Sequence, residues 1–124
     1  MKSGTMYKQG EIVVIPFPFT DLNSIKQRPV LVISNDEYNE KADDFIVCSI
    51  TSNLENTIYS VMIDNLSLTE GFIPVTSRVK ADKLFTLKQS LGKKKIAKVK
   101  DEILQKVNEE VKKVIEVKKI KVWF

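Results

Sequence analysis

The chain has only two arginines among its 20 basic residues, and one of them, Arg28, stands at a position suited to binding an anion. A guanidinium is a planar fork that binds phosphate through two parallel hydrogen bonds, whereas the lysine ammonium is a mobile point charge. Arg28 precedes Pro29, which favours an extended backbone, and opens the apolar segment 28–34. A buried strand would therefore fix its backbone while the polar loop 20–27 leaves its side chain exposed. Arg28 could equally pair with a local carboxylate such as Asp21.

Two more pairs of polar residues follow predicted strands. Thr51 and Ser52 come at the end of the apolar segment 45–51, and adjacent hydroxyls there can donate hydrogen bonds to a phosphate oxygen. Such residues are also ordinary turn formers. Lys80 and Asp82 supply a cation and a carboxylate near the end of another strand. A pair of this kind is more often a surface ion pair than a catalytic one.

The composition excludes several other chemistries. The 124 residues include no histidine and a single cysteine, Cys48. Histidine acid–base pairs, Cys/His nucleophiles, intramolecular disulfides and most transition-metal sites are therefore excluded, and we expect no metal or cofactor. Cys48 lies in an apolar run and is expected to be a small core residue in a reducing cytoplasm. The first ten residues lack the apolar segment of a signal peptide, and we expect no contact with a membrane.

The charge is unevenly distributed. Residues 1–86 hold 8 Lys+Arg and 11 Asp+Glu, a net charge of −3, whereas residues 87–124 hold 12 and 5, a net charge of +7. A lysine-rich surface attracts phosphate backbones without reading their sequence. The same pattern is also typical of a solvated lysine face, and composition alone does not separate these two interpretations.

Apolar segments rich in β-branched and aromatic residues, bounded by turn formers, predict six strands. These are residues 11–19, 28–34, 45–51, 57–63, 74–80 and 84–87. Their close spacing leaves no room for helical crossovers, so the sheet should be antiparallel and strongly coiled. The segment 28–34 shows no alternation and should be the buried central strand. Pro16 cannot donate to a ladder, so the first strand should fray or reach an edge there.

The C-terminal part of the chain has helical character. Apolar residues recur at helical spacing from Ile103 to Ile115, with acidic residues at the start and lysines at the end, which predicts a helix over residues 101–119. The apolar tail, 120–124, could add a strand or a dimer contact. We therefore expect one α+β, mainly β domain over residues 1–124, with an N-terminal extension at 1–9.

Four motifs in a fixed order resemble the MazF/PemK toxins of type II toxin–antitoxin systems. The segment GEIVVIPFPFTD (10–21), followed by RPVLVIS (28–34), is similar to the opening of that family. The segments CSITS (48–52) and VKADKLFTL (79–87) resemble its second and third motifs. The pattern from Gly92 to Glu110 resembles its C-terminal helix. The first motif is the most specific, and the resemblance covers nearly the whole chain.

The resemblance implies a coiled antiparallel SH3-like barrel of the CcdB/MazF/PemK type with a C-terminal helix, usually as a homodimer. It also implies a metal-independent, sequence-selective endoribonuclease acting on single-stranded RNA. In that reaction the ribose 2′-OH attacks the adjacent phosphorus and leaves a cyclic phosphate and a free 5′-OH. By position, Arg28 and Thr51 correspond to the family's catalytic arginine and threonine, and Asp82 to an acidic residue used by some members.

Further roles follow from the same resemblance. Arg28 would stabilise charge on the phosphate, Thr51 would bind the phosphate or the 2′-OH, and Asp82 is the carboxylate available as a base. The residues expected to bind RNA are Ser52, Lys80, Phe19 and Lys26. The expected protein partner is a cognate acidic antitoxin that folds onto the toxin, and the resulting complex is expected to bind DNA.

Two other functions stay open. Lys80 stands where some family members have a second functional arginine, and the loop before Arg28 is shorter than in many relatives. Both features bear on which bases are recognised, and Lys80 also allows a non-catalytic RNA- or protein-binding module of the same fold. A third possibility is a toxin that poisons a topoisomerase. The fold alone does not decide between these functions.

Overall fold

The computed structural model describes residues 6–17, 26–55 and 57–119. These ranges contain seven strands, two α-helices and two 3-10 turns, the turns at Asn65–Ser67 and Gln89–Leu91. In chain order the main elements are β1 (Glu11–Phe17), β2 (Lys26–Val32), α1 (Asp36–Lys41), β3 (Asp44–Thr51), β4 (Ser60–Ile63), β5 (Leu68–Gly71), β6 (Ser77–Lys88), β7 (Lys94–Val99) and α2 (Asp101–Ile115). None of the described helices is long and apolar enough to cross a membrane.

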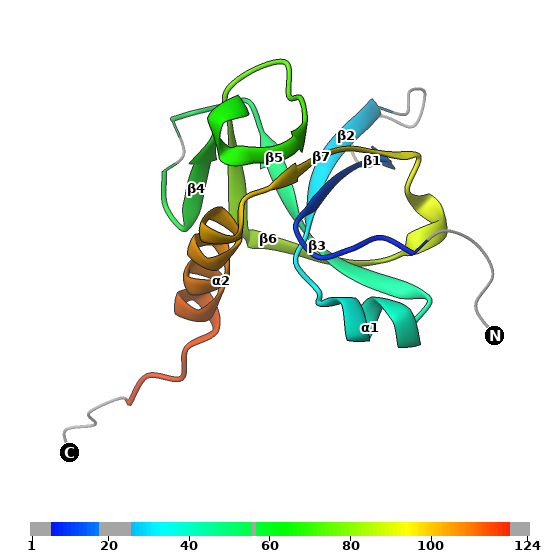
Figure 1. Cartoon of the computed structure of the whole chain (residues 1–124). Coiled ribbons are helices and arrows are strands. Elements are labelled where there is room, and N and C mark those ends of the chain that lie inside the picture. Colours follow the sequence, from blue (N-terminus) through cyan, green and yellow to red (C-terminus); the bar gives the residue numbers. More distant parts are fainter. Residues whose placement is uncertain (1–5, 18–25, 56, 120–124) are drawn as a thin grey trace.

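All seven strands form one sheet, with the strand order β4-β6-β3-β2-β1-β7-β5. Every pairing is antiparallel, and the sheet curls on itself with α2 packed beside β4 and β6 (Figure 1). The predicted fold, a coiled antiparallel and mainly β sheet followed by a C-terminal helix, is therefore confirmed.

The predicted central strand is β2, which lies between β1 and β3. Val30, Leu31 and Val32 are completely buried. Because side chains alternate along a strand, Leu31 packs into one core with Cys48, whereas Val30 packs into a second core with Phe45. Burying each such side chain contributes roughly 1.5–3 kcal/mol, so β2 is firmly held on both faces.

The edge expected at Pro16 is a local one, because β1 is an interior strand. The pairing of β1 with β7 ends at Val14 and Lys94, and the carbonyl of Val14 accepts a hydrogen bond from Lys93 N at 2.8 Å. Backbone groups alternate in direction along a strand, so residue 16 faces the same side as residue 14. The N–H that Pro16 lacks would therefore point past the end of β7, where no ladder is interrupted.

Two strands were not predicted, and one was predicted in two pieces. β7 is half lysine and β5 is only four residues long, so neither shows a clear strand pattern in the sequence. β6 is one strand of 12 residues where two were expected, at 74–80 and 84–87. Its register against β3 jumps so that Leu84 pairs with Cys48 and Lys80 with Ser49. The three residues between them are accommodated as a bulge.

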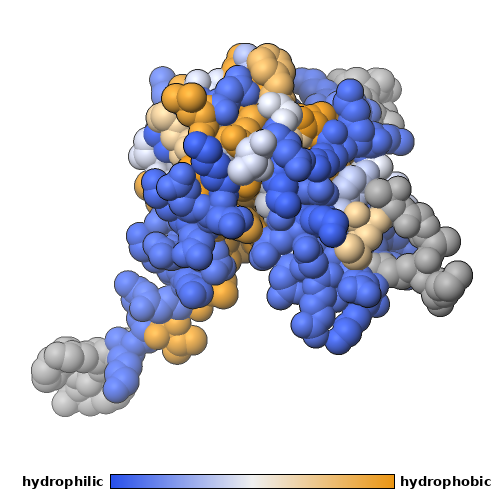
Figure 2. Space-filling view, viewed as in Figure 1, coloured by the Kyte–Doolittle hydropathy of each residue, from blue (hydrophilic) through white to orange (hydrophobic). Residues whose placement is uncertain are grey.

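The helix α2 begins at Asp101, as predicted, but ends at Ile115 instead of residue 119. Val107 is fully buried against the sheet, whereas Ile115 is 66% exposed and Val117 is 95% exposed. Figure 2 shows this exposed apolar surface at the free end of the helix. In the described part of the chain, the residues around and beyond Ile115 pack against no other element, which explains why the helix ends earlier than predicted. The predicted tail contact, at 120–124, lies outside the described residues.

A buried amide ties the start of the described chain to the rest of the molecule. The side-chain nitrogen of Gln89 donates to the carbonyls of Asn39 at 2.8 Å, Ala42 at 3.1 Å and Asp44 at 3.2 Å. Its side-chain oxygen accepts from the backbone N–H of Tyr7 at 3.0 Å. Gln89 is 6% exposed, so water cannot easily replace these hydrogen bonds.

Replacing Gln89 by alanine should therefore destabilise the fold. Several buried backbone groups would lose their partner, so we expect the free energy of unfolding in urea to fall by about 2–4 kcal/mol. The matched control is Gln105→Ala on the exposed face of α2, which should change it by less than about 0.5 kcal/mol. Equal losses in the two variants would contradict the role given to Gln89.

Candidate functional site

The sheet splits open at one end of its central strand. The last residues paired between β2 and β3 are Val30 and Ser49. Beyond them β2 continues beside β1 back to Lys26, and β3 continues beside β6 as far as Thr51. Figure 1 shows the start of β2 and the end of β3 leaning apart. The gap between them opens a cleft in an otherwise continuous sheet.

A pocket of about 500 Å³ lies between the diverging strands. Its first wall consists of the consecutive residues 26–29 of β2, so the pocket follows the edge of this strand. Its second wall carries Ile50 of β3 and Ser52, which directly follows this strand. The remaining lining residues come from β7 and from the segment at the start of β6: Ile73, Pro74, Val75, Ser77 and Ile96. The pocket therefore combines apolar walls with the basic side chains of Lys26 and Arg28.

Arg28 is exposed at the first wall of this pocket. Its side chain makes no hydrogen bond or ion pair with any residue in the ranges 6–17, 26–55 and 57–119. The alternative partner, Asp21, lies outside the described residues. The backbone of Arg28 pairs with Ile15 of β1, so the strand is fixed while the guanidinium extends from it. This is the rigid mounting that the sequence predicted.

A smaller pocket of about 290 Å³ lies on the other side of the end of β3. Its lining residues are Ser49, Thr51, Asn53, Lys80, Lys83 and Phe85. Because side chains alternate along a strand, Ser49 and Thr51 face this pocket while Ile50 and Ser52 face the larger one. The end of β3 is therefore the wall between the two pockets. The adjacent hydroxyls of Thr51 and Ser52 do not act on one point in space.

The hydroxyl oxygen of Thr51 accepts a hydrogen bond from the backbone N–H of Asn53 at 3.1 Å. The side-chain oxygen of Asn53 accepts in turn from the N–H of Glu55 at 3.0 Å. Thr51 is thus part of a turn, in agreement with the turn-forming residue types of this segment. A hydroxyl can donate as well as accept, and within the described ranges this proton has no acceptor, so Thr51 can still donate to a ligand.

Lys80 is buried, with 5% of its side chain exposed. Its ammonium donates to the carbonyl of Ile58 at 3.2 Å and lies 3.7 Å from a carboxylate oxygen of Asp82. A buried ammonium needs such partners, because leaving it unpaired is costly. This arrangement anchors the segment before β4 to β6. Asp82 is partly exposed and lines neither pocket.

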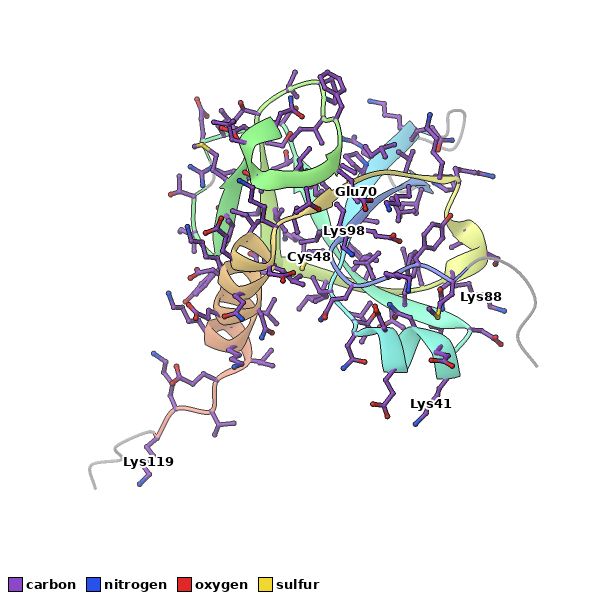
Figure 3. The ribbon with its side chains drawn as sticks, viewed as in Figure 1. Lys41, Cys48, Glu70, Lys88, Lys98 and Lys119 are labelled. Atoms are coloured by element: carbon purple, nitrogen blue, oxygen red, sulfur yellow. The ribbon has the colours of Figure 1, made fainter. Side chains whose placement is uncertain are left out.

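Cys48 lies inside the sheet (Figure 3) and is fully buried, as predicted. Burial, with a smaller contribution from the negative charge of Asp82, raises the pKa of its thiol to about 12. The thiol therefore stays protonated near neutral pH and is unsuited to act as a nucleophile.

Some of the lysine charge predicted for the C-terminal part is neutralised within the fold. Lys95 of β7 lies 3.2 Å from a carboxylate oxygen of Glu11 and also pairs with Glu70, which is labelled in Figure 3. The hydrogen bond from Lys95 lowers the pKa of Glu70. Within the described part of the chain, no group of three acidic or cysteine side chains could hold a metal ion.

Several lining residues of the two pockets were not predicted from the sequence. They are Gln27, Asn53, Ser77, Lys83 and Phe85. Gln27 could have been found, because it precedes Arg28 in a polar segment. Lys83 and Phe85 could not, because their positions depend on the bulge in β6. The predicted residue Lys26 lines the larger pocket with Arg28, and Phe19 lies outside the described residues.

The chain matches one protein family by sequence and several solved structures by fold. A family model described as PemK-like, MazF-like toxin of type II toxin–antitoxin system matches residues 8–115. No curated protein sequence gives a significant match. A MazE–MazF complex from Deinococcus radiodurans has a TM-score of 0.74 at 21% identity, covering 92% of this chain and 100% of that chain.

Two mycobacterial structures are similar as well. An endoribonuclease in complex with its cognate antitoxin has a TM-score of 0.70 at 17% identity, covering 92% of this chain and 99% of that chain. The Mycobacterium tuberculosis toxin MazF-mt6 has a TM-score of 0.70 at 16% identity, covering 87% of this chain and 98% of that chain. At these identities, the structural likeness establishes the fold.

The burial of Lys80 leads to a prediction about stability. Lys80→Ala would leave a cavity and deprive the Ile58 carbonyl and Asp82 of their partner, so the free energy of unfolding should fall by about 2–4 kcal/mol in urea. Lys83→Ala, which removes an exposed lysine of the same strand, is the control and should change it by less than about 0.5 kcal/mol. An unchanged stability of Lys80→Ala, together with weaker RNA binding, would show that Lys80 contacts RNA.

Proposed function

Because the chain belongs to the PemK-like, MazF-like family of toxins of type II toxin–antitoxin systems, we propose that it is a metal-independent endoribonuclease that cleaves single-stranded RNA. One observation carries this proposal. The exposed guanidinium of Arg28 lies at one wall of a pocket of about 500 Å³ whose other wall carries Ser52, while Thr51 lines the adjoining smaller pocket on the other side of the end of β3. A cationic fork facing a hydroxyl across a cleft, with a second hydroxyl just beyond the wall, suits a phosphodiester backbone that passes over the end of β3.

In the proposed reaction the nucleophile belongs to the RNA. The ribose 2′-oxygen forms a bond to the adjacent phosphorus, and the bond from phosphorus to the 5′-oxygen breaks. The 2′-OH loses its proton in this step, and the leaving 5′-oxygen gains one. The protein then needs to hold the backbone and stabilise the additional negative charge. Arg28 is assigned to the non-bridging phosphate oxygens, where one such donor is worth roughly 3–4 kcal/mol.

Thr51 is assigned to the phosphate or to the 2′-OH. Its oxygen is already held by the N–H of Asn53, so the orientation of its remaining proton is restricted. Ser52 and Lys26 face the larger pocket and are assigned to the neighbouring nucleotide. Asp82 is assigned to proton transfer, and its carboxylate is held in place by Lys80.

The same cleft suits the proposed protein partner, an acidic antitoxin. Apolar walls at Ile73, Val75 and Ile96, next to Lys26 and Arg28, match a peptide that carries both apolar and acidic residues. An antitoxin segment there would exclude RNA by occupying its binding site. We further propose that the toxin acts as a homodimer in the cytoplasm, and that its complex with the antitoxin binds DNA.

The central test is cleavage of a long single-stranded RNA in EDTA, with mapping of the 5′-OH ends. The wild-type chain should produce discrete ends, and Arg28→Ala should reduce the rate at least about 100-fold. Arg28→Lys, which keeps the charge but loses the fork, should also be strongly impaired. Lys41→Ala is the control, since Lys41 lies on α1, away from the start of β2 (Figure 3), and should cleave normally.

Other outcomes of this assay identify the alternative functions. Normal cleavage by Arg28→Ala would remove Arg28 from the mechanism. Intact RNA with tight binding by the wild-type chain would indicate a non-catalytic module. Intact RNA together with a stalled topoisomerase would indicate a poison of that enzyme.

A second prediction concerns the hydroxyl of Thr51. Thr51→Val keeps the shape of the side chain but removes the donor, so the rate of cleavage should fall by on the order of 10–100-fold. Thr51→Ser keeps the hydroxyl and should retain most of the activity. A rate for Thr51→Val within about twofold of wild type would reduce Thr51 to a turn residue at the end of its strand.

A further inference from the structure

We propose that Pro29 is a positioning residue that keeps the cleft between β2 and β3 open. The N–H that proline lacks is the one that would continue the ladder between these strands. This inference rests on the proposed function, because it concerns the pocket to which RNA binding has been assigned. It assigns no contact with substrate to Pro29 itself.

The direction of the backbone groups follows from one printed contact and the register. The N–H of Ile33 donates to the carbonyl of Ile46 at 2.9 Å, so residue 33 faces β3 and residue 46 faces β2. The register is regular from there to the last pair, Val30 and Ser49. Backbone groups alternate in direction along a strand, so residues 31 and 29 also face β3, and residues 48 and 50 also face β2.

The next mutual pair in this ladder would therefore join residue 29 to Ile50. Each residue of such a pair normally donates its N–H to the carbonyl of the other. Pro29 has no N–H, so the carbonyl of Ile50 receives no hydrogen bond from it. The ladder ends at this point, with Val30 and Ser49 as its last pair. Both Pro29 and Ile50 line the 500 Å³ pocket that begins there.

The opening affects only one side of β2. The neighbouring residue, Arg28, faces β1, where it pairs with Ile15, and this ladder continues to Phe17 and Lys26. The strand thus stays attached to β1 while its other edge separates from β3. Arg28 keeps a fixed backbone on one wall, and the end of β3, which stays paired with β6, leads to Ser52 on the other wall. A continued ladder would instead bring the two strands to the usual spacing of about 4.8 Å and fill the space between them.

Pro16 provides an internal comparison within the same sheet. It also lies in an interior strand and lacks an N–H. An N–H at position 16 would face the side of β1 on which the pairing with β7 has already ended, at Val14. Replacing Pro16 therefore restores an N–H without giving it a partner strand. The N–H missing from Pro29 faces the seam between β2 and β3, that is, the line along which these two strands would pair. The N–H missing from Pro16 faces the other side of β1, beyond the end of β7. The two prolines are therefore a matched pair for an experiment.

The exchange of backbone amide hydrogens in the wild-type chain gives the first test. The N–H of Gln27 faces the open seam and should exchange quickly, whereas the N–H of Arg28 faces β1 and should be protected. This measurement needs no variant and no RNA, so it holds even if a substitution at Pro29 prevents folding. Protection of Gln27 to the same degree as Arg28 would show that the seam is closed and would overturn the proposal.

The second test compares Pro29→Ala with Pro16→Ala. In Pro29→Ala the new amide should be protected by the carbonyl of Ile50, and kcat for RNA cleavage should fall by on the order of 10–100-fold, with a smaller change in KM, because the groups on the two walls are displaced. In Pro16→Ala the new amide should be unprotected, and cleavage should stay within about twofold of wild type.

An unprotected amide at position 29, or a protected one with wild-type kcat, would overturn the role of Pro29. Failure of the wild-type chain to cleave RNA would instead count against the proposed function. The amide exchange pattern would still decide whether Pro29 opens the seam, so the two failures are distinguishable.

Discussion

The hydrogen-bond ladder along β2 is the interaction on which both the stability and the candidate site depend. On the side of β1 it runs the full length of the strand, from Leu31 and Ile12 to Lys26 and Phe17. On the side of β3 it stops at Val30, and the four residues 26–29 are paired with β1 alone. The same strand is therefore a buried core element over residues 30–32 and a wall of a cleft over residues 26–29. A rigid strand with one free edge can expose a charged side chain without losing its position.

The alternation of side chains distributes the functional candidates over two pockets. Along the end of β3, odd-numbered residues line the smaller pocket and even-numbered residues line the larger one. From β6, Lys80, Lys83 and Phe85 reach the smaller pocket from both sides of the bulge, and the ammonium of Lys80 donates to the carbonyl of Ile58. Neighbours in sequence such as Thr51 and Ser52 are separated, while residues from four strands are brought together.

The sequence predicted those parts of the structure that depend on local pattern. The buried central strand, the core position of Cys48, the beginning of α2 and the family resemblance all follow from short segments, and all agree with the structure or the family comparison. Arg28 was expected to open the central strand, which instead begins two residues earlier, at Lys26. The lysine-rich β7, the short β5 and the bulge in β6 depend on contacts between distant segments, which no local pattern shows. The inward direction of Lys80 has the same origin. It depends on the contact of its ammonium with the carbonyl of Ile58, which comes from a distant segment.

The absence of histidine from the sequence is compatible with the reaction proposed for this cleft. A reaction whose nucleophile is the substrate's own hydroxyl needs no activated side chain, so the protein's main contribution is position and charge. Position is the property that a strand anchored on one edge supplies, and charge is what a guanidinium supplies independently of pH in the physiological range. A lysine at the same place would keep the charge but lose the two fixed directions of the fork. The scarcity of arginine in a lysine-rich chain therefore makes the location of Arg28, beside the one seam that its own strand leaves open, the most informative feature of the molecule.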